Sequence, residues 1–381
     1  MKIFKNISSF LIVLFLFLSP LSANQISDST LVQIVLVSPG KQLYSIFGHS
    51  AFRFYDYKNN LDITFNFGTF NPEEKNFIIK FLKGTLNYYL SKSSFQNLLL
   101  EAYYEKRSVF VHTLNLNYNQ KLFLYNYLDS LHKINYSYRY KFFKDNCATK
   151  IRDLVFLCYN DSLNIEKKNI KCSFRDCLDP YLKSHPFFGN GINILLGNKV
   201  DIFTNEYERM FLPDTLSILI SHASYKNRVI SDNLRPIFTI EKEKNEIEIV
   251  FSYIILTLIF VLFLTLYYKI LIRKSYTIED FALNTLFFIV GIVILLMWTF
   301  SCHYEVKYNF NILWANPLTL LLVFFNKNKK LYNIISFILF LFCLILFIFH
   351  FLGIQKFTLF VIVLNLLLLI KYFFVILVKE R

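Results

Sequence analysis

Long apolar stretches in the last third of the chain constrain its fold more than any other feature. They cover residues 249–268, 281–300, 312–325, 331–352 and 357–378. Four of the five approach or exceed the length of about 20 residues that an α-helix needs to cross a bilayer. The third is shorter and contains Pro317, which removes a helical hydrogen bond. The sequence therefore predicts a transmembrane helical bundle of about five spans.

Basic residues indicate which way this bundle faces. Alternate loops and the C-terminal end hold Lys269, Arg273, Lys274, Lys327, Lys329, Lys330, Lys379 and Arg381, whereas the intervening loops hold only Lys307 and Lys356. The positive-inside rule then places the N-terminal region outside. The net charge of +14 is accordingly assigned to topology and to contact with anionic lipid, because no basic helix is interleaved with aromatic residues. We expect the membrane, and no nucleic acid, as a partner.

The N-terminus has the pattern of a secretory signal peptide, with Lys2 and Lys5, an apolar run at 10–18 and a small-residue stretch ending at Ala23. Cleavage is expected after Ala23, so residues 1–23 are removed. An uncleaved signal anchor is the alternative, and it leaves the next domain on the same side of the membrane.

The remaining chain divides by composition. Residues 24–240 mix charged and apolar side chains as a globular domain does and are expected to be periplasmic. A charged juxtamembrane linker at 241–248 leads to the bundle at 249–378, and 379–381 form a cytoplasmic tail. The expected location is the inner membrane of a bacterium, as a multi-pass protein.

Residue periodicity predicts an α+β fold for the exported domain. Strand patterns occur at 31–37, 51–55, 63–67 and 109–114, and helical spacing occurs at 73–83, 94–104 and 118–132. Phe52 and Phe54 are expected to face the core, with Ala51 and Arg53 on the opposite, solvent-facing side. The strands are expected to form an antiparallel sheet.

A further helix is predicted to begin beside Cys147, with Asp145 or Asn146 as its cap. Unpaired backbone N–H groups in a first helical turn favour a thiolate, which makes Cys147 a candidate nucleophile. His49, at the start of a strand, is the candidate base. A histidine that precedes the cysteine, here by 98 residues, corresponds to a circularly permuted papain-like (NlpC/P60-like) thiol domain.

Other polar residues have more than one possible role. Ser50 and Arg53 could orient His49 or bind a phosphate headgroup, or could simply be solvent-facing. Asn146 could orient His49 or stabilise an oxyanion in addition to capping its helix. His303, in an outer loop, could contact the domain or a headgroup. Cys172 and Cys177 are close enough in sequence for a disulfide, which we leave open. No spacing is typical of a metal site, and no cofactor is expected.

Several segments resemble the landmarks of the Lnb family, whose members carry an Lnb N-terminal periplasmic domain. They are Gly48-His49-Ser50-Ala51-Phe52-Arg53, Phe67-Gly68-Thr69-Phe70, Lys83-Gly84 with Tyr88, residues 145–153, His185-Pro186, Leu195-Leu196-Gly197 with Asp201, and Phe211-Leu212-Pro213. The family includes lipoprotein N-acyltransferases of Bacteroidota, and the resemblance implies a catalytic pair that matches Cys147 and His49.

The resemblance implies an acyltransferase that moves a fatty acyl chain from a phospholipid, through a Cys147 thioester, to the N-terminal amine of diacylated lipoproteins. Two other interpretations stay open. One is a periplasmic cysteine peptidase or cell-wall amidase, although a soluble substrate would not require several spans. The other is a non-catalytic membrane sensor or scaffold, which would not require His49 and Cys147.

Overall fold

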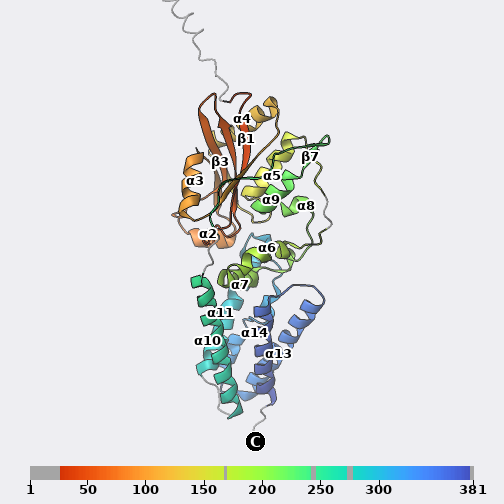
Figure 1. The fold of residues 1–381 in the computed structure, drawn as a ribbon. Coiled ribbons are helices and arrows are strands. Elements are labelled where there is room, and N and C mark those ends of the chain that lie inside the picture. The colour runs from red at the N-terminus through yellow and green to blue at the C-terminus, as the bar shows by residue number, and fades with distance from the viewer. Residues whose placement is uncertain (1–25, 167–169, 242–245, 273–277, 378–381) are drawn as a thin grey trace, which may run out of the picture.

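The computed structural model describes residues 26–166, 170–241, 246–272 and 278–377. It shows a mixed α/β domain placed on the end of a helical bundle (Figure 1). The predicted signal peptide and cytoplasmic tail lie outside the described residues, as do residues 242–245 of the predicted linker. Helix α10 begins at Glu246, inside that linker.

A seven-stranded sheet organises the N-terminal domain, in the order β6-β4-β3-β2-β1-β5-β9. Its strands are β1 (Leu31–Val37), β2 (His49–Asp56), β3 (Leu61–Thr69), β4 (Asn87–Ser94), β5 (Val109–Thr113), β6 (Ser137–Arg139) and β9 (Arg235–Phe238). Every pairing is antiparallel, which confirms the predicted sheet type. A separate hairpin joins β7 (Ser224–Tyr225) to β8 (Arg228–Val229).

The helices of this domain are α2 (Phe77–Lys83), α3 (Phe95–Tyr104), α4 (Tyr118–Lys133), α5 (Cys147–Cys158), α6 (Phe174–Lys183), α7 (Pro186–Leu195), α8 (Glu206–Arg209) and α9 (Pro213–Ser221). A 3₁₀ turn, η1, covers Asn198–Val200. Three predicted helices correspond to α2, α3 and α4, with α2 beginning four residues later than expected.

Both faces of the sheet are buried, which corrects the expectation of a solvent-facing side. Phe52 and Phe54 face the core formed with α4 and α5, as predicted. Ala51, on the opposite face, is fully buried in a second core with Phe95 of α3. The interior strand β1 explains this, because its residues from Val32 to Val37 are all buried, as in a strand that is covered on both faces.

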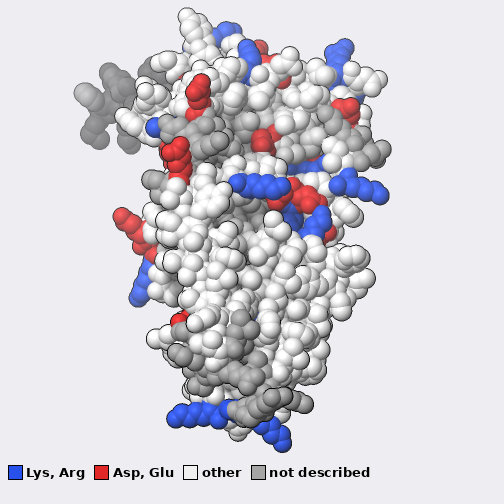
Figure 2. Space-filling model, turned by 60° about the horizontal axis from the view of Figure 1, so that its bottom comes forward, with Lys and Arg blue, Asp and Glu red and all other residues white. Residues whose placement is uncertain are grey.

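Among the described residues, four helices of the bundle are long and apolar enough to cross a membrane: α10 (Glu246–Leu271), α11 (Ile278–Phe300), α13 (Lys329–Phe351) and α14 (Leu359–Leu377). Figure 2 shows a belt with very few charged residues over the bundle and basic residues at the end away from the exported domain. Lys329 and Lys330, exposed at the start of α13, belong to the loops predicted to be inside.

The remaining apolar stretch, 312–325, does not form a spanning helix among the described residues, which corrects the predicted third span. It contains part of η3 (Phe310–Leu313) and the six-residue helix α12 (Thr319–Phe324). The ring of Phe310 packs 4.8 Å from that of Phe349, near the end of α13, whereas Asn328 caps its start. The segment from η3 to α12 therefore runs the length of α13. We call this segment, in which an irregular stretch interrupts the helix, a broken crossing.

Protein contacts surround this broken crossing. Ala315 and Thr319 are fully buried, and the Thr319 hydroxyl donates to the Asn284 carbonyl at 2.9 Å. A Cβ at Gly291 of α11 would stand 2.3 Å from the Ala315 carbonyl oxygen, so only glycine permits this approach. Irregular backbone is tolerated at membrane depth where it is enclosed by protein in this way.

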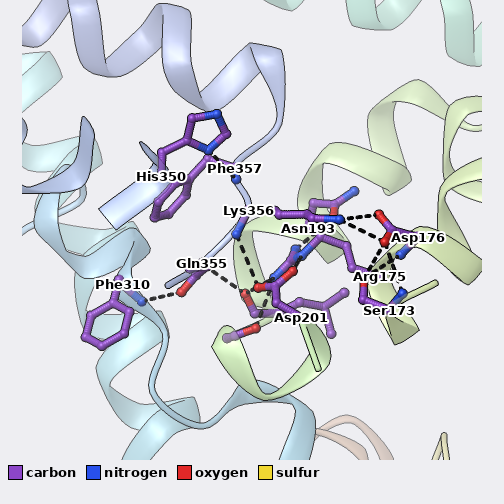
Figure 3. Close-up of polar contacts among 12 residues, drawn as sticks. Ser173, Arg175, Asp176, Asn193, Asp201, Phe310, His350, Gln355, Lys356 and Phe357 are labelled. Carbon is purple, nitrogen blue, oxygen red and sulfur yellow. Dashed lines mark hydrogen bonds and ion pairs between the residues drawn. The ribbon is translucent and has the colours of Figure 1, made fainter. Parts of the chain in front are cut away.

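Polar contacts fix the exported domain to the outer loops of the bundle. The buried Arg175 guanidinium of α6 pairs with Asp201 at 2.7 Å and donates to Asn193 Oδ1 at 3.0 Å. Lys356, from the loop between α13 and α14, pairs with Asp176 at 2.8 Å, and its backbone N–H donates to Asp201 (Figure 3). The domain is therefore docked on the bundle at this point.

A second contact joins α7 to the first turn of α10. Glu248 is buried, and its Oε2 lies 3.0 Å from His185 Nδ1. Its Oε1 accepts hydrogen bonds from the backbone N–H groups of Phe187 and Phe188, both at 3.1 Å. This carboxylate satisfies donors at the start of α7 that have no helical partner. The end of the predicted linker is thus a buried structural contact.

Candidate active site

Cys147 is the first residue of α5, as predicted. Asn146 caps the helix: its Oδ1 accepts from the Thr149 backbone N–H, and Thr149 Oγ1 accepts from the Asn146 N–H, both at 2.8 Å. The Asn146 amide nitrogen also donates to the carbonyls of Phe142 and Phe211. Because both ends of its amide are engaged, Asn146 holds the helix start in place and is not directed at His49.

The His49 imidazole lies beside the thiol. Both side chains come within 4 Å of the point where a Cβ of Gly68 would stand, and each shifts the pKa of the other. His49 Nε2 is 2.7 Å from Oδ1 of Asn66 on β3. Since an amide oxygen only accepts, Nε2 carries the proton, and Nδ1 is the nitrogen left for Cys147. Asn66 thus holds the ring and its tautomer.

This pairing changes the proton affinity of both groups. Burial disfavours the Cys147 thiolate, but the charge of His49, the hydrogen bond with it and donors from Ser50 outweigh burial and lower the pKa of the thiol to about 7. Burial likewise opposes protonation of His49, yet the Cys147 thiolate raises the pKa of the imidazole above its usual value. A thiolate and imidazolium pair is therefore accessible near neutral pH.

Ser50 supplies donors on the other side of the sulfur. Its side chain is fully buried, and its hydroxyl makes no hydrogen bond within the part of the chain that the structure describes. Both this hydroxyl and the Ser50 backbone N–H favour the Cys147 thiolate. A buried donor without a neutral partner is costly unless an anion forms beside it. Ser50 is thus suited to stabilise negative charge at this position.

Gly68 closes the site from β3. Its φ of 139° lies in the region that favours glycine, and the pairing of β3 with β4 is bulged between Phe67 and Thr69. A Cβ at this position would stand 3.2 Å from His49 Cε1 and 3.9 Å from Cys147 Cβ. The absence of a side chain therefore lets β3 approach the thiol and imidazole closely.

Tyr88 belongs to the hydrophobic core against which Cys147 and Tyr140 pack. Tyr88 stacks on Tyr140 with ring centroids 4.4 Å apart. Burial, followed by the charge of Cys147, raises the pKa of Tyr88 to about 12, so its hydroxyl stays protonated. Burial also raises the pKa of Tyr140, with smaller contributions from Tyr88, Cys147 and Glu305. The charges of both Cys147 and Glu305 of the outer loop thus act on Tyr140.

The structure brings together three of the six predicted site residues: Cys147, His49 and Ser50. Arg53 lies on the other face of the sheet, where its guanidinium is 3.7 Å from the centre of the Phe95 ring and pairs with Asp62. His303 contacts the domain, since its Nε2 donates to the Phe81 carbonyl at 2.8 Å. Neither of these two residues is brought to Cys147.

Asn66 is the site residue that the sequence analysis missed. Phe52 pairs with Phe65, so continuing the β2–β3 register sets His49 opposite Gly68 and diagonal to Asn66. A polar residue at 66 between buried Phe65 and Phe67 was the available signal. Placing Asn66 beside His49 also requires the register between β2 and β3, which the alternation of polar and apolar residues alone does not give.

Other candidate side chains lie elsewhere. His112 is fully buried, neither of its ring nitrogens has a partner within the described residues, and burial lowers its pKa to about 4. The Sγ atoms of Cys172 and Cys177 are 2.9 Å apart and unbonded, so they are adjacent thiols in this structure. These groups have no contact with the pair formed by Cys147 and His49 among the interactions described above.

Comparison with known proteins identifies both parts of the chain. Residues 20–175 match the family model described as the Lnb N-terminal periplasmic domain, and residues 245–381 match the Lnb transmembrane domain. The comparison with curated proteins gave no match, and neither did the comparison with solved structures. The two models match most of the chain in the expected order, and the chain belongs to the Lnb family, as a membrane protein with a periplasmic N-terminal domain.

Proposed function

We propose that this protein is a thiol-dependent acyltransferase of the inner membrane, with phospholipid as acyl donor and the N-terminal amine of diacylated lipoproteins as acceptor. The observation that carries the proposal is the pair formed by Cys147 and His49. Burial alone would raise the pKa of the thiol, but His49 and Ser50 outweigh burial and lower this pKa to about 7. Family membership supports an enzyme of this class, and the residues supply the chemistry.

In the first step, His49 accepts the thiol proton and the Cys147 sulfur attacks an ester carbonyl of the phospholipid. The carbonyl oxygen becomes an oxyanion, and the proposed donors to it are the Ser50 hydroxyl and backbone N–H, which also favour the thiolate. The ester C–O bond then breaks, and the imidazolium gives its proton to the departing oxygen. The products are a thioester on Cys147 and a lysophospholipid.

In the second step, the free amine of the lipoprotein attacks the thioester carbonyl. The C–S bond breaks, His49 takes the proton that the amine releases, and the thiolate and imidazolium pair is restored. An amide replaces a thioester, so the step is downhill. Asn66 keeps the His49 ring in one orientation through both proton transfers.

Mass spectrometry of Cys147 after incubation with phospholipid vesicles tests the first step. We expect a mass increase equal to one acyl group on the peptide containing Cys147, removable by hydroxylamine. Release of free fatty acid without transfer to an amine would indicate a hydrolase, in which water replaces the acceptor. Absence of any adduct with native folding would favour a binding role.

The second step is tested in a host that lacks its own lipoprotein N-acyltransferase. Expression of this chain should convert lipoprotein N-termini from two acyl chains to three, and the Cys147→Ser variant should not. Thioester formation combined with unchanged lipoproteins would overturn the proposed acceptor while leaving the donor step intact.

A further inference from the structure

Helix α2 presents apolar side chains that the protein does not cover. Ile78 is 70% exposed and Ile79 is 53% exposed, and Phe81 and Leu82 are exposed as well. No residue of this helix is buried. A group of large exposed apolar residues on one short helix is unfavourable in water and marks a contact surface.

Hydrogen bonds hold the end of α2 against the outer end of α11. The Ser301 hydroxyl donates to the Leu82 carbonyl at 2.7 Å, and the Cys302 N–H donates to the Lys83 carbonyl at 2.8 Å. His303 adds the contact with Phe81, and its ring lies 3.2 Å from where a Cβ of Gly84 would stand. These contacts satisfy carbonyls at the end of α2 and fix its height.

That height coincides with the membrane boundary. Helix α11 is long and apolar enough to span the membrane, and it ends at Phe300, one residue before this contact. Figure 1 shows α2 at the end of the exported domain that faces the bundle. The exposed lysines Lys75 and Lys83 flank the apolar residues. Apolar residues flanked by cations are typical of a helix that lies in the lipid interface.

Aromatic rings connect this helix to the candidate active site. The ring of Phe81 stacks on Phe77 at 6.5 Å, Phe77 lies 5.7 Å from Phe70, and Phe70 lies 5.3 Å from Tyr88. Tyr88 belongs to the hydrophobic core against which Cys147 packs. A row of ring contacts therefore connects the exposed face of α2 with the core that holds the nucleophile.

We propose that α2 is embedded in the outer leaflet of the membrane that the bundle spans, and that it forms the entrance through which an acyl chain reaches Cys147. The embedding stands on exposure and on the contact with α11 alone. The role as an entrance rests on the proposed acyltransferase function.

Depth-dependent quenching tests the embedding in full-length protein in phospholipid vesicles. A fluorescent amino acid replaces Ile79 in one variant and Ile218 in the other. Ile218 is 51% exposed, but it belongs to α9, which lies farther from the bundle than α6 and α7 (Figure 1). Lipids with a quencher near the headgroup should quench position 79 several-fold more strongly than position 218. Equal quenching at both positions would overturn the proposal.

Charge substitution tests the entrance. Ile79→Glu should reduce thioester formation from phospholipid vesicles by roughly tenfold or more, because it removes an interfacial contact worth more than 1.4 kcal/mol. Labelling by a short-chain soluble ester should be unchanged, and Ile218→Glu should affect neither. Equal loss with both donors would refute an entrance. If no donor labels wild-type Cys147, the proposed function fails, and the quenching result still decides the embedding.

Discussion

The exported sheet domain and the membrane bundle both bury polar side chains, but they use them differently. In the bundle, Lys371 of α14 is fully buried, donates to Asn284 of α11 at 2.8 Å and pairs with Asp280 at 3.4 Å. Asn365 donates to the Cys343 carbonyl of α13. These contacts join neighbouring helices, as expected where unpaired polar groups are costly.

The sheet domain also keeps polar groups available around Cys147. The Ser50 hydroxyl has no partner within the described residues, and His49 uses one ring nitrogen for Asn66 and directs the other at Cys147. The candidate nucleophile and base therefore lie in the sheet domain, whereas the polar groups of the bundle hold its helices together and position the sheet domain. The following predictions test this division.

Replacing the nucleophile should give the largest effect. Cys147→Ser should reduce acyl transfer by about a thousandfold or more, because a hydroxyl beside this base is far less ionised than the thiol. Membrane insertion and the unfolding midpoint should stay at the wild-type values. Activity within a few-fold of wild type would remove Cys147 from the mechanism. The readout is triacylated lipoprotein measured by mass spectrometry.

Loss of the base should give the next largest effect. His49→Ala should lower transfer at neutral pH by about a hundredfold, within the range for a positioned general base. The pKa of Cys147 should return from about 7 towards 9.0 or above, since His49 is its main stabilising partner. The pH at which iodoacetamide labelling of Cys147 is half-maximal should therefore rise, and alkaline pH should restore part of the activity.

Two further variants sharpen this prediction. Asn66→Ala removes only the residue that orients His49, so we expect about a tenfold loss with a smaller rise in the pH of half-maximal labelling. His112→Ala is the comparison for a buried histidine outside the site. A greater loss of transfer in His112→Ala than in His49→Ala, without unfolding, would show that the base was assigned to the wrong residue.

Removing the bundle tests whether it is more than an anchor. A chain ending at residue 241 should fold, because the main core of the sheet domain contains only residues between Ile26 and Ile230. Thioester formation from a soluble ester should persist, and that from vesicles should fall by about a hundredfold as the tether to the bilayer is lost. Equal labelling by vesicles in both proteins would contradict the assigned role of the bundle.

Substitutions at the docking point should act on stability: Arg175 and Asp201 both belong to the exported domain, and Lys356 connects this pair to the bundle. Arg175→Met should lower the free energy of unfolding by about 3–5 kcal/mol, because it leaves the buried Asp201 carboxylate without its cation. Lys356→Met breaks an ion pair whose side chains are largely exposed and should cost below about 1 kcal/mol. Denaturant unfolding in detergent measures both values. Similar losses in the two variants would show that burial does not set the strength of this contact.

Local patterns predicted much of the fold. Strand β1, helices α3 and α4 and the four long spans were all predicted within a few residues, because alternation and helical spacing depend on neighbours close in sequence. The start of α5 at Cys147 was predicted for the same reason, since a cap is a contact over three residues. The landmarks His185 and Asp201 were recognised, but their roles in docking were not.

The sequence by itself determined that the chain has an apolar bundle behind a mixed domain, the direction in which its charges orient that bundle, and a cysteine at a helix start. Only the tertiary structure decided that Asn66 supports His49, that Arg53 faces the opposite core, that the third apolar stretch is broken, and that α2 stays uncovered beside α11. The physical reason is distance along the chain. Local periodicity depends only on residues close in sequence. It therefore does not predict strand register, burial of the second face of a sheet or the docking of one region on another.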